Sequence, residues 1–269
     1  MQHEDRNYGM RWRLAAAMVL VTLLAGGTAR GAAYVELPDG TRVEGSAIRA
    51  RPDGEIILTT PLGVRNFAPG RYRRAVAPMP AEFDRARRLL GDRQFDEALP
   101  LLAQVVREYR FLEWDLRAQR FIARIHATRE QFSEAVQAYE RLFEMSDRKD
   151  EASEVRWGYK QALVRDRRFD TVMPLIEEHI RAGEREDAAR AQILRGDLRL
   201  AQGNQEEALL DYLRTVILFE GQREQQPRAL LKAAEVLQQR RDARAAELLG
   251  RLVRDFPDSP EAARARQMM

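Results

Sequence analysis

No cysteine occurs among the 269 residues, and this absence excludes several kinds of site. Disulfide bonds, thiolate metal sites and cysteine nucleophiles all need that residue, as does lipid attachment at an N-terminal cysteine. Histidine is scarce too: only His3, His126 and His179 occur, and no two are spaced four apart as in a helical zinc site. The sequence also lacks a glycine-rich phosphate loop and a Gly-x-Ser-x-Gly elbow. We therefore expect no enzymatic activity, no metal and no cofactor.

Lysine is nearly absent, because Lys149, Lys160 and Lys232 are the only three. Arginine supplies the remaining positive charge, which raises the isoelectric point to about 9.4 although the formal net charge is only +3. Removing residues 1–33 would take away four arginines and two acids and leave a net charge of +1. Nucleic-acid-binding proteins normally carry a clear excess of positive charge, so we expect no nucleic acid partner.

Long hydrophobic runs are missing as well. The main apolar run, Leu14–Leu24, follows Arg11 and Arg13 and precedes small residues that continue to Ala33. A membrane-spanning helix needs about 20 apolar residues, whereas a basic flank, a shorter apolar run and small residues are typical of a secretory signal. Residues 1–33 resemble a bacterial export signal, cleaved after Gly31 or Ala33 and starting at Met1 or Met10.

Two consequences follow from this interpretation of the N-terminus. The mature protein is expected to be periplasmic or secreted, with no stable membrane span after cleavage. An uncleaved membrane anchor stays open as the alternative.

Residues 34–80 have the composition of short β-strands joined by tight turns. Pro-Asp-Gly occurs at 38–40 and again at 52–54, and Pro61-Leu62-Gly63 separates two further β-rich runs. Asp-Gly between such runs favours hairpins, because glycine readily adopts the positive φ that these turns need. We expect four or five strands in a small all-β, SH3-like module. At about 45 residues it can bury little apolar surface alone, so it should pack against the helices that follow.

From residue 81 to residue 269 the sequence is helical in pattern and repeats itself at intervals of 36 or 37 residues. The repeated four-residue segments begin at Phe95, Phe132, Phe169, Gln205 and Asp242. Their fourth members are Ala98, Ala135, Val172, Ala208 and Ala245. Nine positions before each segment lie Ala86, Ala123, Lys160, Gly196 and Ala233. Four positions after each fourth member lie Leu102, Tyr139, Ile176, Tyr212 and Leu249.

This pattern predicts a stack of helix pairs. Small residues let two antiparallel helices approach closely, and large residues one helical turn later fill the contact between pairs. A single pair cannot bury its apolar face, so neighbouring pairs must stack. The pattern resembles the tetratricopeptide repeat family, with Gly91-Asp92 and Gly203-Asn204 similar to its turn. The period exceeds the usual ~34 residues of that family, and Lys160 stands where a small residue is expected.

The resemblance implies an α-solenoid of five helix pairs plus a capping helix, with the first helix of each pair facing a concave groove. Arg117, Arg120 and Arg124 are spaced three and four apart and therefore share one face of their helix. Guanidinium groups bind carboxylates well, so we predict a site for a partner that bears a carboxylate. The candidate partner-binding residues are Arg87, Arg117, Arg120, Arg124, Trp157, Gln161 and Arg165. Further groove positions are Phe83, Glu154, Arg190, Ile193 and Asp197.

The alternative interpretation of the arginines is a solvated helix face with Glu113 or Glu154 as partners. For the whole chain, we expect a non-enzymatic scaffold that binds a protein or peptide in the bacterial cell envelope. Two other functions stay open from the sequence alone: an envelope hydrolase or an accessory to a wall-associated enzyme, with its site in the β module, and a structural protein that self-associates as a homo-oligomer.

Overall fold

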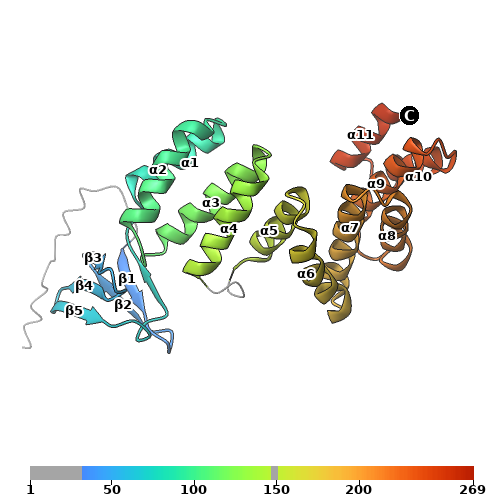
Figure 1. Ribbon diagram of the computed structural model, residues 1–269. Helices are drawn as coiled ribbons and strands as arrows, with labels where there is room; N and C mark the ends of the chain where they lie inside the picture. Colours follow the sequence, from blue (N-terminus) through green and yellow to red (C-terminus); the bar gives the residue numbers. More distant parts are fainter. Residues whose placement is uncertain (1–31, 147–150) are drawn as a thin grey trace, which may run out of the picture.

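The computed structural model describes residues 32–146 and 151–269, and Figure 1 shows its two parts, a small β module followed by a curved array of helices. The expected export signal, apart from Ala32 and Ala33, lies outside the described residues. Within those residues no helix combines the length and the apolar character needed to cross a membrane.

The β module contains six strands in two antiparallel sheets. The strands are β1 (Ala33–Glu36), β2 (Arg42–Gly45), β3 (Ala47–Ala50), β4 (Ile56–Thr60), β5 (Gly63–Phe67) and β6 (Arg74–Val76). One sheet has the order β2-β1-β6 and the other the order β3-β4-β5. Because Ala33 pairs with Gly45 and is buried, the first strand begins one residue before the expected module start at Tyr34.

The predicted turns lie where the sequence placed them. Gly40, Gly54 and Gly63 all have positive φ, at 86°, 88° and 115°. The side chains of Asp39 and Asp53 accept hydrogen bonds from backbone amides two residues on, at 2.8 and 3.0 Å. The structure has one strand more than the four or five expected. The short β6 has few residues of high strand propensity, and it is ordered by pairing with β1.

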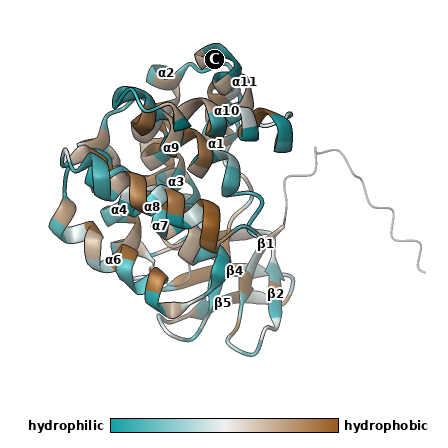
Figure 2. Ribbon diagram, turned by 90° about the vertical axis from the view of Figure 1, so that its right-hand side faces the viewer, coloured by the Kyte–Doolittle hydropathy of each residue, from teal (hydrophilic) through white to brown (hydrophobic). Residues whose placement is uncertain are grey.

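Eleven helices form the rest of the described chain, as five pairs and a final single helix. They are α1 (Ala81–Gly91), α2 (Phe95–Glu108), α3 (Trp114–Thr128), α4 (Phe132–Met145), α5 (Ser153–Arg165), α6 (Phe169–Ala182), α7 (Arg185–Ala201), α8 (Gln205–Leu218), α9 (Gln226–Gln239), α10 (Arg244–Asp255) and α11 (Pro260–Met268). The helices at the front of Figure 2 carry hydrophobic and hydrophilic residues in alternation along the ribbon, as expected when one side packs inward.

The repeated small residues lie at the helix contacts, as the sequence predicted. Ala86, Ala123 and Ala233 are fully buried, and a side chain on Gly196 would collide with the ring of Tyr212. The exception is Lys160, which is buried at the corresponding place in the third repeat with only 5% exposure. A charged residue therefore occupies a contact that the other repeats reserve for small side chains.

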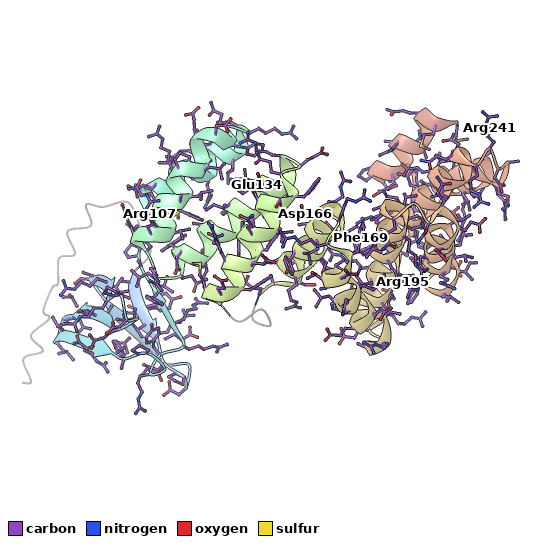
Figure 3. All side chains as sticks on the ribbon, viewed as in Figure 1. Arg107, Glu134, Asp166, Phe169, Arg195 and Arg241 are labelled. Atoms are coloured by element: carbon purple, nitrogen blue, oxygen red, sulfur yellow. The ribbon has the colours of Figure 1, made fainter. Side chains whose placement is uncertain are left out.

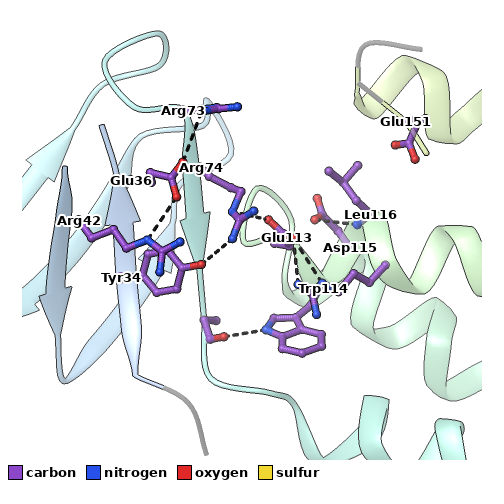
Figure 4. A network of polar contacts seen from close by, with 12 residues as sticks. Tyr34, Glu36, Arg42, Arg73, Arg74, Glu113, Trp114, Asp115, Leu116 and Glu151 are labelled. Atoms are coloured by element: carbon purple, nitrogen blue, oxygen red, sulfur yellow. Dashed lines mark hydrogen bonds and ion pairs between the residues drawn. The ribbon is translucent and has the colours of Figure 1, made fainter. Parts of the chain in front are cut away.

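The β module packs on the first repeats as expected. A single hydrophobic cluster runs from Val35 and Ile56 of the sheets to Phe83 and Leu102 of the first helix pair. At the same junction the Trp114 indole nitrogen donates to the Ala77 carbonyl at 2.7 Å (Figure 4). The module is thus continuous with the helical core.

Polar contacts reinforce this junction. Arg74 donates to the Tyr34 hydroxyl at 2.6 Å and pairs with Glu113 at 3.0 Å, so it links the first sheet to the start of α3 (Figure 4). The hydrogen bond from Arg74 to the Tyr34 hydroxyl and the negative charge of Glu113 raise the pKa of the Arg74 guanidinium. A permanently charged side chain therefore holds the module in place.

Candidate functional site

The candidate site is a groove of about 1220 Å³ along the concave side of the helix array. The first helix of every pair contributes to its wall, from Phe83 of α1 to Lys232 of α9. This arrangement confirms the predicted orientation of the helices. Eight basic residues line the groove, against three acidic ones. The basic set comprises Arg87, Arg117, Arg120, Arg124, Arg165, Arg167, Arg228 and Lys232.

The three arginines of α3 reach the groove together, but two of them are already paired. Arg117 pairs with Glu113 at 3.0 Å and lies over the Trp114 ring at 4.7 Å. Arg120 forms two hydrogen bonds to the Glu151 carboxylate, at 2.7 and 3.0 Å, where Glu151 is only 2% exposed. Since a buried carboxylate binds Arg120 on both oxygens, this arginine links Glu151, which lies just before α5, to α3.

Arg124 and Arg87 differ from these two. Both are exposed on the groove wall, and neither forms an ion pair within residues 32–146 and 151–269. The guanidinium carbon of Arg124 lies 6.0 Å from the centroid of the Phe121 ring, a contact that uses none of the guanidinium hydrogen-bond donors. Of the predicted arginine stripe, the last member is therefore the one able to bind a ligand.

The prediction that Trp157 lines the groove is wrong. Its side chain is 1% exposed and packs against the His179 ring of α6, with ring centroids 4.8 Å apart, while its indole nitrogen donates to Asp187 of α7 at 3.3 Å. Arg190 lies over the same ring at 4.8 Å. The large apolar ring gains more by burial between α6 and α7 than by facing water.

Two further residues that were predicted to line the groove do not line it. Ile193 is buried at 1% exposure in the core of the fourth repeat, and Arg190 stays with Trp157 outside the groove lining. The remaining predicted members of the α5 wall do line the groove. Gln161 faces it, and Arg165 lies 3.9 Å from Glu130 and 4.8 Å from the Phe132 ring.

The structure adds Tyr139 and Gly158 to the site. Tyr139 belongs to α4, a second helix, yet its hydroxyl reaches the groove floor next to Gly158 of α5. The sequence pattern assigned Tyr139 to the contact between repeats, which is true of its ring, since the residue is 3% exposed. The glycine within α5 was the available signal, because glycine inside a helix often marks a close approach.

The other end of the groove is organised around an acid. Asp197 of α7 pairs with Arg228 at 2.7 Å and with Lys232 at 3.4 Å, and both partners belong to α9. Asp197 also accepts a hydrogen bond from the Tyr212 hydroxyl at 2.8 Å. Here the charges of the groove are satisfied within the chain.

Comparison with known proteins agrees with this geometry. Two segments, residues 83–153 and residues 228–259, match family models described as tetratricopeptide repeat. The sequence matches no curated protein.

Two solved structures each align with 69% of this chain. YrrB, described as a TPR protein with an unusual peptide-binding site, is 17% identical, with 69% of this chain and 90% of YrrB aligned at a TM-score of 0.41. The Rap protein, solved in complex with Competence and Sporulation Factor, is 13% identical at a TM-score of 0.50. That alignment covers 69% of this chain and 54% of Rap, so the chain spans about half of Rap's length. Two segments of the chain therefore match the tetratricopeptide repeat, and its five stacked helix pairs have a tetratricopeptide-like arrangement.

Proposed function

We propose that this chain is an exported, non-enzymatic scaffold that binds a protein or peptide partner in the concave groove. The observation that carries the proposal is the groove itself. Its volume of about 1220 Å³ exceeds that of a typical small-molecule pocket, ~300–1,000 Å³. It is an open channel along several repeats, which suits an extended chain.

The charge of the groove supports a partner with negative groups. Basic residues outnumber acidic ones along the lining, and Arg87 and Arg124 are not neutralised by a partner among the described residues. Isolated like charges on one wall destabilise the free protein slightly. A bound anion would offset this cost, and a guanidinium can grip it with two parallel hydrogen bonds.

Export forms the second half of the proposal and is supported by the N-terminal sequence alone, where Arg11 and Arg13 precede the apolar run Leu14–Leu24. The envelope of a bacterium is the proposed location. Mass spectrometry of the protein from its native cell should find a mature N-terminus between Ala32 and Tyr34. An intact Met1 or Met10 in a cytoplasmic fraction would exclude export.

Photo-crosslinking in the native cell tests the groove. A benzophenone amino acid is placed at Thr128, on the groove wall, and in a matched variant at Glu177, an exposed position on α6 outside the lining. Adducts with a partner should form from Thr128 and not from Glu177. Adducts from Glu177 alone would place the partner on another face and overturn the proposal.

A further inference from the structure

Two tyrosines occupy equivalent positions in the second and fourth repeats. Tyr139 lies four residues after Ala135, and Tyr212 lies four residues after Ala208. Both are almost fully buried, at 3% and 0% exposure. Their hydroxyls nevertheless have different surroundings, and this difference indicates what the groove binds.

In the fourth repeat the tyrosine meets a carboxylate of the chain. The Tyr212 hydroxyl donates to Asp197 at 2.8 Å, and the same carboxylate pairs with Arg228 and Lys232. A hydroxyl and two cations therefore surround one carboxylate on the groove wall. The carboxylate accepts the hydrogen bond of the hydroxyl and pairs with both cations, so each of these four groups has a partner within the chain.

In the second repeat the carboxylate is absent. Asp197 directly follows Gly196, and the equivalent residue, directly after Ala123, is Arg124. An arginine has only donors, so it cannot accept from the Tyr139 hydroxyl. Among residues 32–146 and 151–269, that hydroxyl has no hydrogen-bond partner, and Arg124 has no ion pair.

The Tyr139 hydroxyl lies directly against a glycine, whose missing side chain leaves room for it. A Cβ atom on Gly158 would collide with the Tyr139 hydroxyl, and all three of Tyr139, Gly158 and Arg124 line the groove. The charge of Arg124 opposes the effect of burial on the Tyr139 hydroxyl, whose pKa is raised overall. Arg124 therefore places a positive charge near this hydroxyl, where it would attract a bound anion.

We propose that Tyr139 and Arg124 form a subsite for a carboxylate of the bound peptide, at the place on the second repeat that the Asp197 side chain fills on the fourth. The ligand carboxylate accepts a hydrogen bond from the Tyr139 hydroxyl and pairs with the Arg124 guanidinium. This inference rests on the proposed function, because it names the ligand chemistry of the same groove. A C-terminal carboxylate and a Glu or Asp side chain offer the same chemistry, and the experiment separates them.

The probes are three libraries of acetylated hexapeptides. The first has a free C-terminal carboxylate and no acidic residue, the second is its C-terminal amide, and the third is amidated with one internal glutamate. Affinity selection on the full mature chain, followed by titration of the best peptide, compares them. Wild type should favour the first or third library over the second by about tenfold or more, as for a charged hydrogen bond shielded from water.

The variants separate the subsite from the groove. Arg124→Gln and Tyr139→Phe should each remove most of the preference for a carboxylate, while Tyr212→Phe, which alters a hydroxyl already bound to Asp197, should keep it. Ala127→Trp, which fills the groove from its α3 wall, should weaken binding of every library.

Three results would count against the proposal. Equal binding of the acid and amide libraries, with Ala127→Trp still inhibitory, overturns the subsite and leaves the proposed function standing. Retained carboxylate preference in both Arg124→Gln and Tyr139→Phe does the same. Failure of all three libraries to bind, or no effect of Ala127→Trp, overturns the subsite together with the peptide-binding groove.

Discussion

The second repeat, α3 with α4, and the fourth, α7 with α8, share a framework but use charge in opposite ways. Both have a small residue in the first helix, a glutamine four residues before it and a buried tyrosine in the second helix. The glutamines, Gln119 and Gln192, each reach the residue before the tyrosine. In the second repeat that residue is Ala138, which accepts through its backbone, whereas in the fourth it is Asp211, which accepts through its side chain.

The fourth repeat therefore pairs its buried acid with arginines of its own helices. Asp211 is fully buried and pairs with Arg195 at 3.0 Å, Arg199 at 2.9 Å and Arg214 at 3.0 Å. In the second repeat an alanine replaces this acid, and Arg124 replaces Asp197. The same helix-pair framework therefore forms a fourth repeat that its acids stabilise and a second repeat in which Arg124 stays available to a ligand.

The largest effect is expected from removing the buried acid of the fourth repeat. Asp211→Ala leaves three arginines without their common partner, and breaking a buried ion pair on one side costs ~3–5 kcal/mol. Urea denaturation should show this loss in the free energy of unfolding. Asp211→Asn, which keeps the hydrogen bond to Gln192, should lose less. A loss below 1 kcal/mol in Asp211→Ala would show that the fourth repeat does not depend on its acid.

The third repeat, which lies between the second and the fourth, buries the charged side chain of Lys160 at a cost in free energy. Burial lowers the pKa of Lys160 from 10.5 to about 8. Arg156 of α5 and Arg190 of α7 lower it further, whereas Glu178 of α6 and Asp187 of α7 oppose this. His179 of α6 and Trp157, whose ring lies 4.4 Å from the ammonium, complete the surroundings.

The sign of the pH dependence follows from this lowered pKa. Below pH 8 the lysine is charged in both states, and the fold bears a cost of about 3 kcal/mol. As the pH rises from 8 to 10.5, the lysine loses its proton in the folded state, and the cost of burying its charge disappears. Lys160→Met should therefore unfold at higher urea concentration than wild type at pH 7, and its advantage should shrink above pH 8. An advantage that grows with pH would contradict the assignment.

Removing each tyrosine hydroxyl compares the two repeats directly. Tyr212→Phe deletes a hydrogen bond to a carboxylate and should cost ~1.5–3 kcal/mol. Tyr139→Phe deletes a hydroxyl that has no partner among the described residues and should change the free energy of unfolding by less than ~0.5 kcal/mol. Thermal and urea unfolding of the two variants provide the measurement, and equal losses would show that the two hydroxyls have equivalent surroundings.

The smallest effect concerns the turns within the repeats. Gly203 has a φ of 89° in the fourth repeat, whereas the equivalent turn of the second repeat places Glu130 at 58°. Arg241 has a similar positive φ in the last such turn, at the far end of the array (Figure 3). Because a side chain is strained at such φ, Glu130→Gly should stabilise the fold by roughly 1 kcal/mol, and Gly203→Ala should destabilise it by a similar amount. Differential scanning calorimetry should show melting temperatures shifted in opposite directions.

Much of the fold could be predicted from the sequence, because the signals were local and periodic. Ala98, Ala135 and Ala208 recur at a fixed interval, and each is fully buried at a helix contact. The turns with Gly40 and Gly54 were equally readable, since positive φ needs a residue without a side chain.

The candidate site was only partly predictable, because its pairings join distant segments. Arg120 and Glu151 are 31 residues apart, and no periodic signal links them. Trp157 occupies the position equivalent to Arg120, one repeat later, but α6 and α7 cover it. Helical spacing gives the face of a residue on its own helix, and the neighbouring helices decide whether that face is open.

The contrast between Tyr139 and Tyr212 is the central claim, and an NMR titration with acetate tests it most directly. Protein labelled with carbon-13 at the tyrosine Cζ atoms is titrated with sodium acetate, and sodium chloride at equal ionic strength is the control. The Tyr139 resonance should shift with acetate in wild type and not in Arg124→Gln, while the Tyr212 resonance, already bonded to Asp197, should stay in place. An unmoved Tyr139 resonance, or equal shifts of both tyrosines, would contradict the account.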